Sequence, residues 1–315
     1  MKPAIALLGI LSGAAHSAPQ TPVSALAAAL AGPRVAYSGH QRSSVTMEGG
    51  AASALVAVWG NGRGASRRQY GEAKTGFTTL QAGTSAWQRQ GAGAWVRLPA
   101  SSRPRPQTDA GRIVRNYLVT AGPATSLLNR TVTPIRIDRK RPFTPFRRLW
   151  VEAETGLILK DDLYGPDGRL RSSTVFTDLR IGPQPPALFA PPASTAPLSG
   201  FGPSSFRPSA SRAEAERLSG RSAPSPRYTP PGFTVEMYGV MTTRHGTYMP
   251  AVRFADGLAA YTIFRRGPGA GRMGAGGPAS DNQRAVVISS RPQGNYLLVG
   301  DIAESELRKV ANSLP

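Results

Sequence analysis

A stretch rich in proline, serine, alanine and glycine interrupts the sequence between residues 183 and 227. A segment of this composition cannot bury enough apolar surface to form a core, so the parts on either side of it must fold separately. At 315 residues the chain is long enough for about two ordinary domains. We therefore expect a first domain over residues 19–190, a Pro/Ser-rich linker over 191–227 and a second domain over 228–315.

The first eighteen residues have the parts of an export signal. Lys2 supplies a positive charge, Ala4 to Leu11 form a short apolar run, and Ala15-His16-Ser17 place small residues where a signal peptidase reads them. The run is much shorter than the stretch of about 20 residues that a membrane span needs. We therefore expect residues 1–18 to be a cleaved signal peptide and the mature protein to be periplasmic, with no transmembrane segment after cleavage.

Charge and cysteine content narrow the possible partners. The formal charge is +20. The chain has no cysteine, and this excludes disulfides, thiolate metal sites and thiol nucleophiles. Such a charge can indicate a polyanionic partner, but the arginines are spread along the chain and a compositional bias explains them better. Export argues against nucleic acid as a partner. Attraction toward an acidic protein or a lipid headgroup remains as a secondary effect.

Short segments separated by glycine-rich breaks indicate a sheet in the first domain. A helix precedes them at 21–31, and a second helix is expected from an N-cap at Asp109 through Tyr117 and Leu118. The expected strands cover residues 35–47, 54–59, 67–72, 77–81, 85–90, 94–98, 131–138, 147–154, 157–164 and 169–181.

The last three of these strands read as an antiparallel meander with turns at Thr155-Gly156 and 166–168. Leu149-Trp150-Val151 and Leu157-Ile158-Leu159 are apolar on both faces, unlike a sheet wetted on one side. A helix around Ile113 can cover one face. The other face must meet a second layer, another domain or a ligand.

The second domain shows the same kind of alternation and then a helix. Asp301 and Glu304 resemble a capping box for that helix, and its expected buried stripe contains Leu307, Val310 and Leu314. The expected strands cover residues 233–238, 248–254, 258–265, 284–290 and 296–299, and one helical turn is possible at 212–218.

The sequence offers no set of residues for catalysis, a metal or a cofactor. After removal of the signal, His40 and His245 are the remaining histidines, which is too few for a histidine-rich metal site. The segment 269–274 matches G-x-G-x-x-G, but it does not open a helix after a strand. The carboxylates of the meander could suit a glycosidase, although ion pairing with neighbouring basic residues explains them better. Those carboxylates are Glu152, Glu154, Asp161 and Asp162, and the basic residues are Arg147, Arg148 and Lys160. We therefore expect a binding protein and not an enzyme.

Several motifs resemble the RseB/MucB family of sigma-factor regulators. The run 148–160, RLWVEAETGLILK, is similar to the family signature, and Asp167-Gly168-Arg169 and 176–181 continue it. In the second domain, Pro230-Pro231-Gly232-Phe233 and Asp256-Gly257-Leu258-Ala259 resemble the family pattern, as does the ending Leu298-Val299-Gly300-Asp301. The glycine-rich loop 267–282 and the long linker depart from it.

The resemblance implies an α+β fold. It implies a strongly curved antiparallel sheet like the LolA/LolB half-barrel, with helices in its concavity, followed by a smaller α+β domain. It also implies a negative regulator of envelope-stress signalling that binds the extracytoplasmic part of a membrane anti-sigma factor and shields it from proteolysis until lipid or lipoprotein signals release it.

The other reading is a periplasmic lipid or lipoprotein carrier of the LolA type. In that case an apolar cavity with the candidates Trp87, Trp95, Trp150 and Phe176 would hold acyl chains, although ordinary core packing is the better explanation for each aromatic taken singly. Candidate partner-binding residues in the second domain are Arg253, Asp256 and Arg265.

Overall fold

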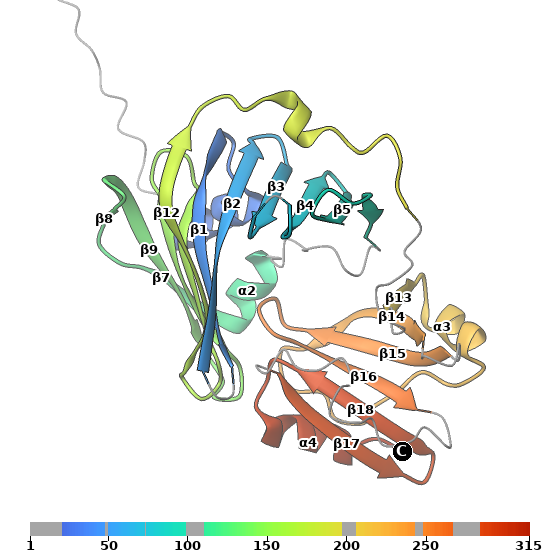
Figure 1. The fold of residues 1–315 in the computed structure, drawn as a ribbon. Helices are drawn as coiled ribbons and strands as arrows, with labels where there is room; N and C mark the ends of the chain where they lie inside the picture. Colours follow the sequence, from blue (N-terminus) through green and yellow to red (C-terminus); the bar gives the residue numbers. More distant parts are fainter. Residues whose placement is uncertain are drawn as a thin grey trace, which may run out of the picture.

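The computed structural model describes residues 21–47, 50–72, 74–98, 110–196, 206–242, 248–266 and 284–315. The expected signal peptide, Asp109, His245 and the glycine-rich 269–274 motif lie outside these residues. Two antiparallel sheets dominate the fold, one large and strongly curved and the other smaller (Figure 1). This confirms the predicted α+β class.

The large sheet has the strand order β6-β5-β4-β3-β2-β1-β12-β11-β10-β9-β7, with β8 paired to β9. Its strands pair antiparallel, and most of them match the segments expected from the sequence. Its strands are β1 (Ala36–Met47), β2 (Gly50–Asn61), β3 (Ala65–Tyr70), β4 (Phe77–Ala82), β5 (Ser85–Gln90), β6 (Val96–Arg97), β7 (Tyr117–Ala121), β8 (Thr125–Leu127), β9 (Arg130–Arg139), β10 (Phe146–Glu152), β11 (Ile158–Tyr164) and β12 (Leu170–Ile181).

Two helices cover one face of the meander in the large sheet. Helix α1 (Pro22–Ala31) begins with Pro22 at its first position and with the Thr21 hydroxyl accepting from the backbone nitrogen of Ser24 at 3.2 Å. Together with α2 (Ala110–Asn116) it packs against the inner face (Figure 1). The buried members of this cluster are Leu26, Ala29, Ile113, Tyr117, Ile135, Ile137, Leu149 and Val151. The prediction that a helix around Ile113 covers the meander is confirmed.

Helix α2 is shorter than predicted. It ends at Asn116, and Tyr117 and Leu118 begin strand β7, which pairs with β9. Pairing with an existing strand satisfies the backbone groups of these residues as fully as a helix would, so tertiary context decides between the two.

The smaller sheet has the order β13-β14-β15-β16-β18-β17. Helix α4 (Glu304–Asn312) packs on it with Leu307 and Val310 buried, as predicted. Leu314 is buried too, but it lies beyond the end of the helix. The predicted capping box is wrong: Ala303 is the N-cap, and the Asp301 carboxylate instead accepts from Arg284 Nε at 2.9 Å. The strands are β13 (Phe206–Ser209), β14 (Thr234–Thr242), β15 (Tyr248–Ala255), β16 (Ala260–Arg266), β17 (Ala285–Arg291) and β18 (Gly294–Gly300).

Part of the expected linker is folded into the smaller sheet. Residues 206–209 form β13, which pairs with β14, and Arg212–Ser219 form the two-turn helix α3. The Ser211 hydroxyl caps this helix and Gly220 ends it in the left-handed conformation. A short 3-10 helix, η2 (Pro186–Phe189), precedes the segment and contacts β2, β3 and β4.

Candidate functional site

The turn between β15 and β16 joins the two sheets. Leu258 in this turn packs against the cluster formed by α1, α2 and the meander. Asn116, the last residue of α2, donates from Nδ2 to the carbonyl oxygens of Asp256 at 2.8 Å and Gly232 at 3.1 Å. Both sheets therefore share a continuous interior at this point.

The carboxylate of Asp256 lies at the centre of this contact. Its Oδ2 accepts from the Tyr117 hydroxyl at 2.7 Å, and its Oδ1 accepts from the backbone nitrogens of Leu258 and Ala259 at 3.0 and 2.7 Å. The residue is only 1% exposed. Burial raises the pKa of Asp256, and the hydrogen bonds from Tyr117 and the backbone oppose that shift.

Close backbone approach reinforces the contact. Gly257 has a φ of +109°, and a Cβ there would lie 2.9 Å from the backbone nitrogen of Ile113. Phe143, in the turn between β9 and β10, packs against the core of the second sheet, and its carbonyl accepts from the Ala303 nitrogen at 3.0 Å. The sheets are thus fixed to each other from both sides.

The carboxylates of the meander are held in ion pairs. Arg147 Nε donates to Asp161 Oδ1 at 2.7 Å, Lys160 Nζ lies 2.9 Å from Asp162 Oδ2, and Arg130 lies 3.6 Å from Glu152. Register places Arg147 and Asp161 on neighbouring strands. The prediction of ion pairing with Arg147 and Lys160 is confirmed for Asp161 and Asp162. Glu152 pairs with Arg130 instead, and Arg148 stacks over Tyr164 at 5.3 Å.

The four aromatic candidates do not form one cavity. Phe176 is 2% exposed and meets Tyr37 edge-on at 6.1 Å between ring centroids, in a cluster against which Trp150 also packs. Trp87 is buried on β5, toward the other end of the sheet. Trp95 follows β5 and carries the Arg89 guanidinium 4.8 Å above its ring. The structure therefore brings together Trp150 and Phe176 only.

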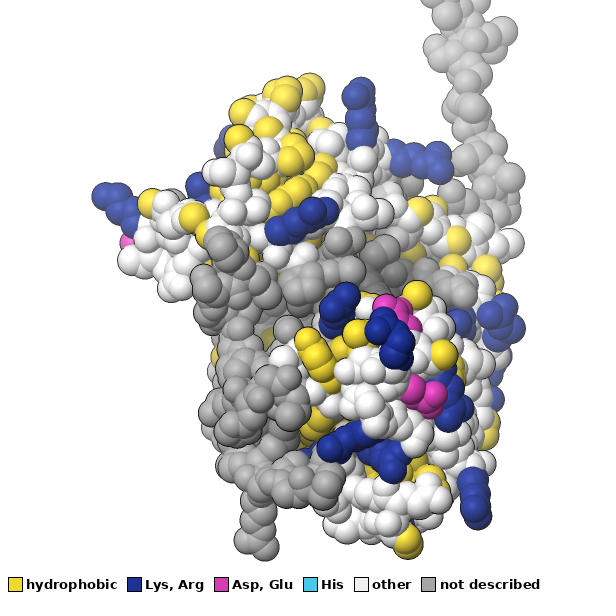
Figure 2. Space-filling model, turned by 90° about the vertical axis from the view of Figure 1, so that its right-hand side faces the viewer, with side chains coloured by type: hydrophobic (Ala, Val, Ile, Leu, Met, Phe, Trp, Pro, Cys, Tyr) yellow, Lys and Arg dark blue, Asp and Glu magenta, His cyan; other side chains and the backbone are white. Residues whose placement is uncertain are grey.

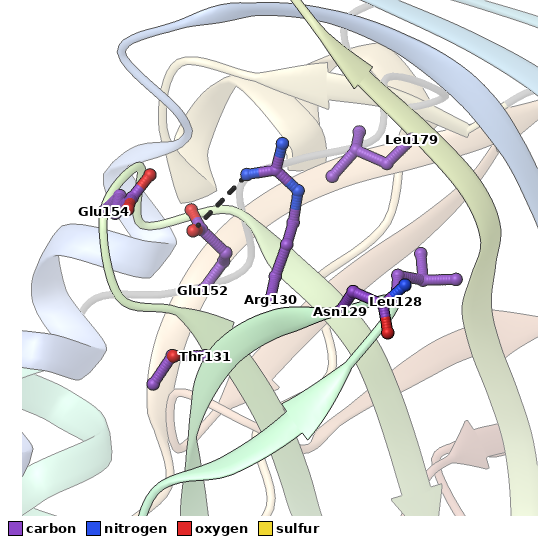
Figure 3. Close-up of a pocket in the computed structure, with 7 residues that line it drawn as sticks. All are labelled: Leu128, Asn129, Arg130, Thr131, Glu152, Glu154 and Leu179. Carbon is purple, nitrogen blue, oxygen red and sulfur yellow. Dashed lines mark ion pairs between the residues drawn. The ribbon is translucent and has the colours of Figure 1, made fainter.

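A pocket of about 450 Å³ opens beside this cluster (Figure 3). The Arg130–Glu152 ion pair lies within it, and Glu154 reaches it from the β10–β11 turn. The remaining lining residues are Leu128, Asn129, Thr131 and Leu179. Such a polar lining suits a headgroup or peptide better than an acyl chain.

The three partner-binding candidates all have contacts within the chain. Arg253 Nε donates to Glu236 Oε2 at 2.6 Å, and Arg265 Nη1 donates to the Ser222 carbonyl at 3.2 Å. Asp256 is buried between the sheets, so its carboxylate is not on the surface. Figure 2 shows Lys and Arg side chains dispersed over the face in view, with few acidic ones between them.

Residues suited to metals are sparse in the described ranges. His40 Nδ1 lies 2.8 Å from Asp178 Oδ2 in an exposed cross-strand pair. Within the described ranges, no group of three or more His, Asp or Glu side chains is placed to hold a metal ion. None of the helices described is long and apolar enough to cross a membrane.

Comparison with known proteins gives a structural match. No family model and no curated protein matches the sequence. The crystal structure of MucB superposes with a TM-score of 0.56 at 14% identity, covering 92% of this chain and 96% of that one. The chain has the MucB fold. The MucB complex with MucA(peri) gives 0.61 at 16% identity over 93% and 97% of the two chains. The Pseudomonas aeruginosa MucA/MucB complex gives 0.62 at 16% over 93% and 98%.

Coverage of this extent means that the shared MucB fold includes both sheets. The contact through Asn116, Tyr117 and Asp256 was missed by sequence reasoning, which gave Asp256 as a candidate for binding a partner. The one sequence signal for this contact is Asp256-Gly257. The pair indicates a tight hairpin turn, but it does not indicate that α2 packs on that turn.

Proposed function

We propose that this protein is exported to the periplasm and binds the extracytoplasmic part of a membrane anti-sigma factor. In that role it acts by binding, not catalysis, and shields its partner from proteolysis. The observation that carries the proposal is the MucB fold over more than nine-tenths of the chain, including the match to MucB with MucA(peri) bound. The identity of 16% supports the fold, and the function is inferred from it.

The contact between the sheets supports one binding unit built from two domains. We propose that residues 19–190 form the first domain and that the second begins at β13, near residue 206, because β13 completes the smaller sheet. Phe143, Tyr117 and Leu258 join the two across their boundary. A partner would therefore meet two sheets in a fixed relation.

Protease protection tests the proposal. The extracytoplasmic segment of each membrane anti-sigma factor encoded in the same genome is incubated with a periplasmic protease, with and without the mature protein. We expect one segment to be protected. Gly257→Ala, which pushes the sheets apart, should weaken protection, whereas Leu118→Ala, at a side chain that is 56% exposed, should not. Absence of protection for every segment would contradict the proposal.

A lipid or lipoprotein carrier is the second candidate. The supporting observation is that the polar pocket at Glu152, which suits a headgroup, lies beside the apolar cluster of Phe176, against which Trp150 packs. Each acyl methylene transferred from water to such a cluster would contribute about 0.8 kcal/mol. Native mass spectrometry of protein purified from its host should show a bound lipid in this case. Protein that is consistently empty would remove this candidate.

A further inference from the structure

Two arginines and two tryptophans gather at the β2–β5 end of the large sheet. Strand register places Trp59 opposite Arg67, and Arg67 opposite Leu80. It then places Leu80 opposite Trp87, two residues before Arg89 on β5. Because residues two apart in a strand share a face, Arg67 and Arg89 lie on the same face of the sheet.

Each guanidinium stacks on an indole ring. Arg67 Cζ lies 5.9 Å from the ring centroid of Trp59, and Arg89 Cζ lies 4.8 Å from that of Trp95. Such stacking holds the charge in place and contributes about 0.5–1 kcal/mol at exposed sites. Both arginines are half-buried, so their ends remain partly accessible.

Neither arginine is neutralised within the part of the chain that the structure describes. The Nε atoms of Arg67 and Arg89 are shielded from solvent and have no hydrogen-bond acceptor. No ion pair to either is found among the described residues. Burial lowers the pKa of the Arg67 guanidinium, and the positive charge of Arg89 lowers it further. The two arginines therefore lie close enough for their charges to interact.

Other shielded arginines of the sheet have a carboxylate close to them. The Nε of Arg148 also lacks an acceptor, but Asp162 lies directly opposite Arg148 on β11. Arg147 is also shielded by the sheet, but Asp161 accepts from it on the neighbouring strand. Buried donors in folded proteins are nearly always paired, because an unpaired one loses its solvation without compensation. Two arginines on one face of the sheet, each with an unpaired Nε, therefore point to an anion that comes from outside the chain.

We propose that Arg67 and Arg89 form a binding site for a phosphate group, flanked by the rings of Trp59 and Trp95. A phosphate monoester carries about −1.5 to −2 charges near neutral pH, which matches two guanidiniums. Arginine presents N–H groups in a fork that fits phosphate oxygens in pairs. The phosphate could be free or part of a lipid headgroup. This inference does not depend on the binding of an anti-sigma factor.

The test compares phosphate sources on the full mature protein. Inorganic phosphate is titrated against chloride at equal ionic strength, with tryptophan fluorescence and melting temperature as readouts. Separately, the protein is sedimented with phosphatidylcholine vesicles with or without phosphatidic acid. Binding of free phosphate identifies a soluble ligand, and binding only to phosphatidic acid vesicles identifies a headgroup. Both outcomes support the site if they depend on Arg67 and Arg89.

Matched variants decide that dependence. Arg67→Gln and Arg89→Gln should each weaken binding by about tenfold, since each removes at least one charge-assisted hydrogen bond. Arg68→Gln removes the same charge from an exposed neighbour whose side chain lies on the other face, and it should leave affinity unchanged. If Arg89→Gln fails to fold, Arg89→Lys replaces it, because lysine keeps the positive charge. Arg89→Lys should also weaken phosphate binding, since lysine lacks the paired N–H groups of arginine. Absence of binding to any phosphate source, or equal loss in Arg68→Gln, would overturn the proposal.

Discussion

Removing the Tyr117 hydroxyl tests whether the buried contact holds the two sheets together. Tyr117 and Asp256 are each 1% exposed, and the hydroxyl donates to the carboxylate at 2.7 Å. A hydrogen bond to a charged group contributes about 1.5–3 kcal/mol. Tyr117→Phe keeps the ring in its core cluster and deletes only this donor. We therefore expect the free energy of unfolding to fall by about 2 kcal/mol.

Urea unfolding followed by far-ultraviolet circular dichroism measures the effect, and Tyr164→Phe is the matched control. Tyr164 is half-buried and stacks on Phe146 at 4.6 Å, so its ring contacts survive the change. The control should stay within about 0.5 kcal/mol of wild type. Equal stability of Tyr117→Phe and wild type, or an equal loss in the control, would refute the reasoning.

Three further perturbations address the same core. Burial raises the pKa of Asp256 in the folded state. The protonated carboxyl therefore contributes most to stability below its unfolded pKa of about 4, and this contribution is lost as pH rises through the higher folded pKa. Urea titrations should therefore show wild type losing stability relative to Asp256→Asn as pH rises; a parallel pH profile would contradict this. Gly257→Ala should lower the melting temperature, because its Cβ would meet Ile113; an unchanged value would show that the turn can shift. Leu149→Ala should cost about 2–5 kcal/mol in urea unfolding, and a loss under 1 kcal/mol would mean that the site collapses around the cavity.

Local sequence patterns predicted most of the strand positions because glycine turns and alternation are short-range signals. The meander strands, the turn at Thr155-Gly156 and the buried stripe with Leu307 and Val310 all follow from spacing along the chain. The ion pair between Arg147 and Asp161 was also within reach, because adjacent strands of a hairpin bring such residues together.

Features that depend on distant pairing were not predictable in the same way. The residues around Tyr117 have a helical pattern, yet Tyr117 begins strand β7, which pairs with β9. Residues 206–209 read as part of a linker by composition, and pairing with the distant strand β14 makes them a strand. Asp256 reads as an exposed turn residue because nothing near it in sequence shows that α2 covers it.

The candidate phosphate site was missed for a related reason. Arg67 and Arg89 are 22 positions apart by their numbers in the sequence, and each looks like one more member of a dispersed basic set. Strand register alone brings them to one face beside Trp59 and Trp95. Spacing along the chain also does not reveal that, among the described residues, neither arginine has an ion pair.

Binding of an anti-sigma factor segment to the full mature protein tests the proposed function most directly. Isothermal titration against the extracytoplasmic segments of the anti-sigma factors from its own genome should give saturable binding to one of them, at micromolar affinity or tighter. Gly257→Ala should weaken that binding, because the segment would no longer meet two sheets in a fixed relation. A folded protein that binds none of these segments would contradict the account.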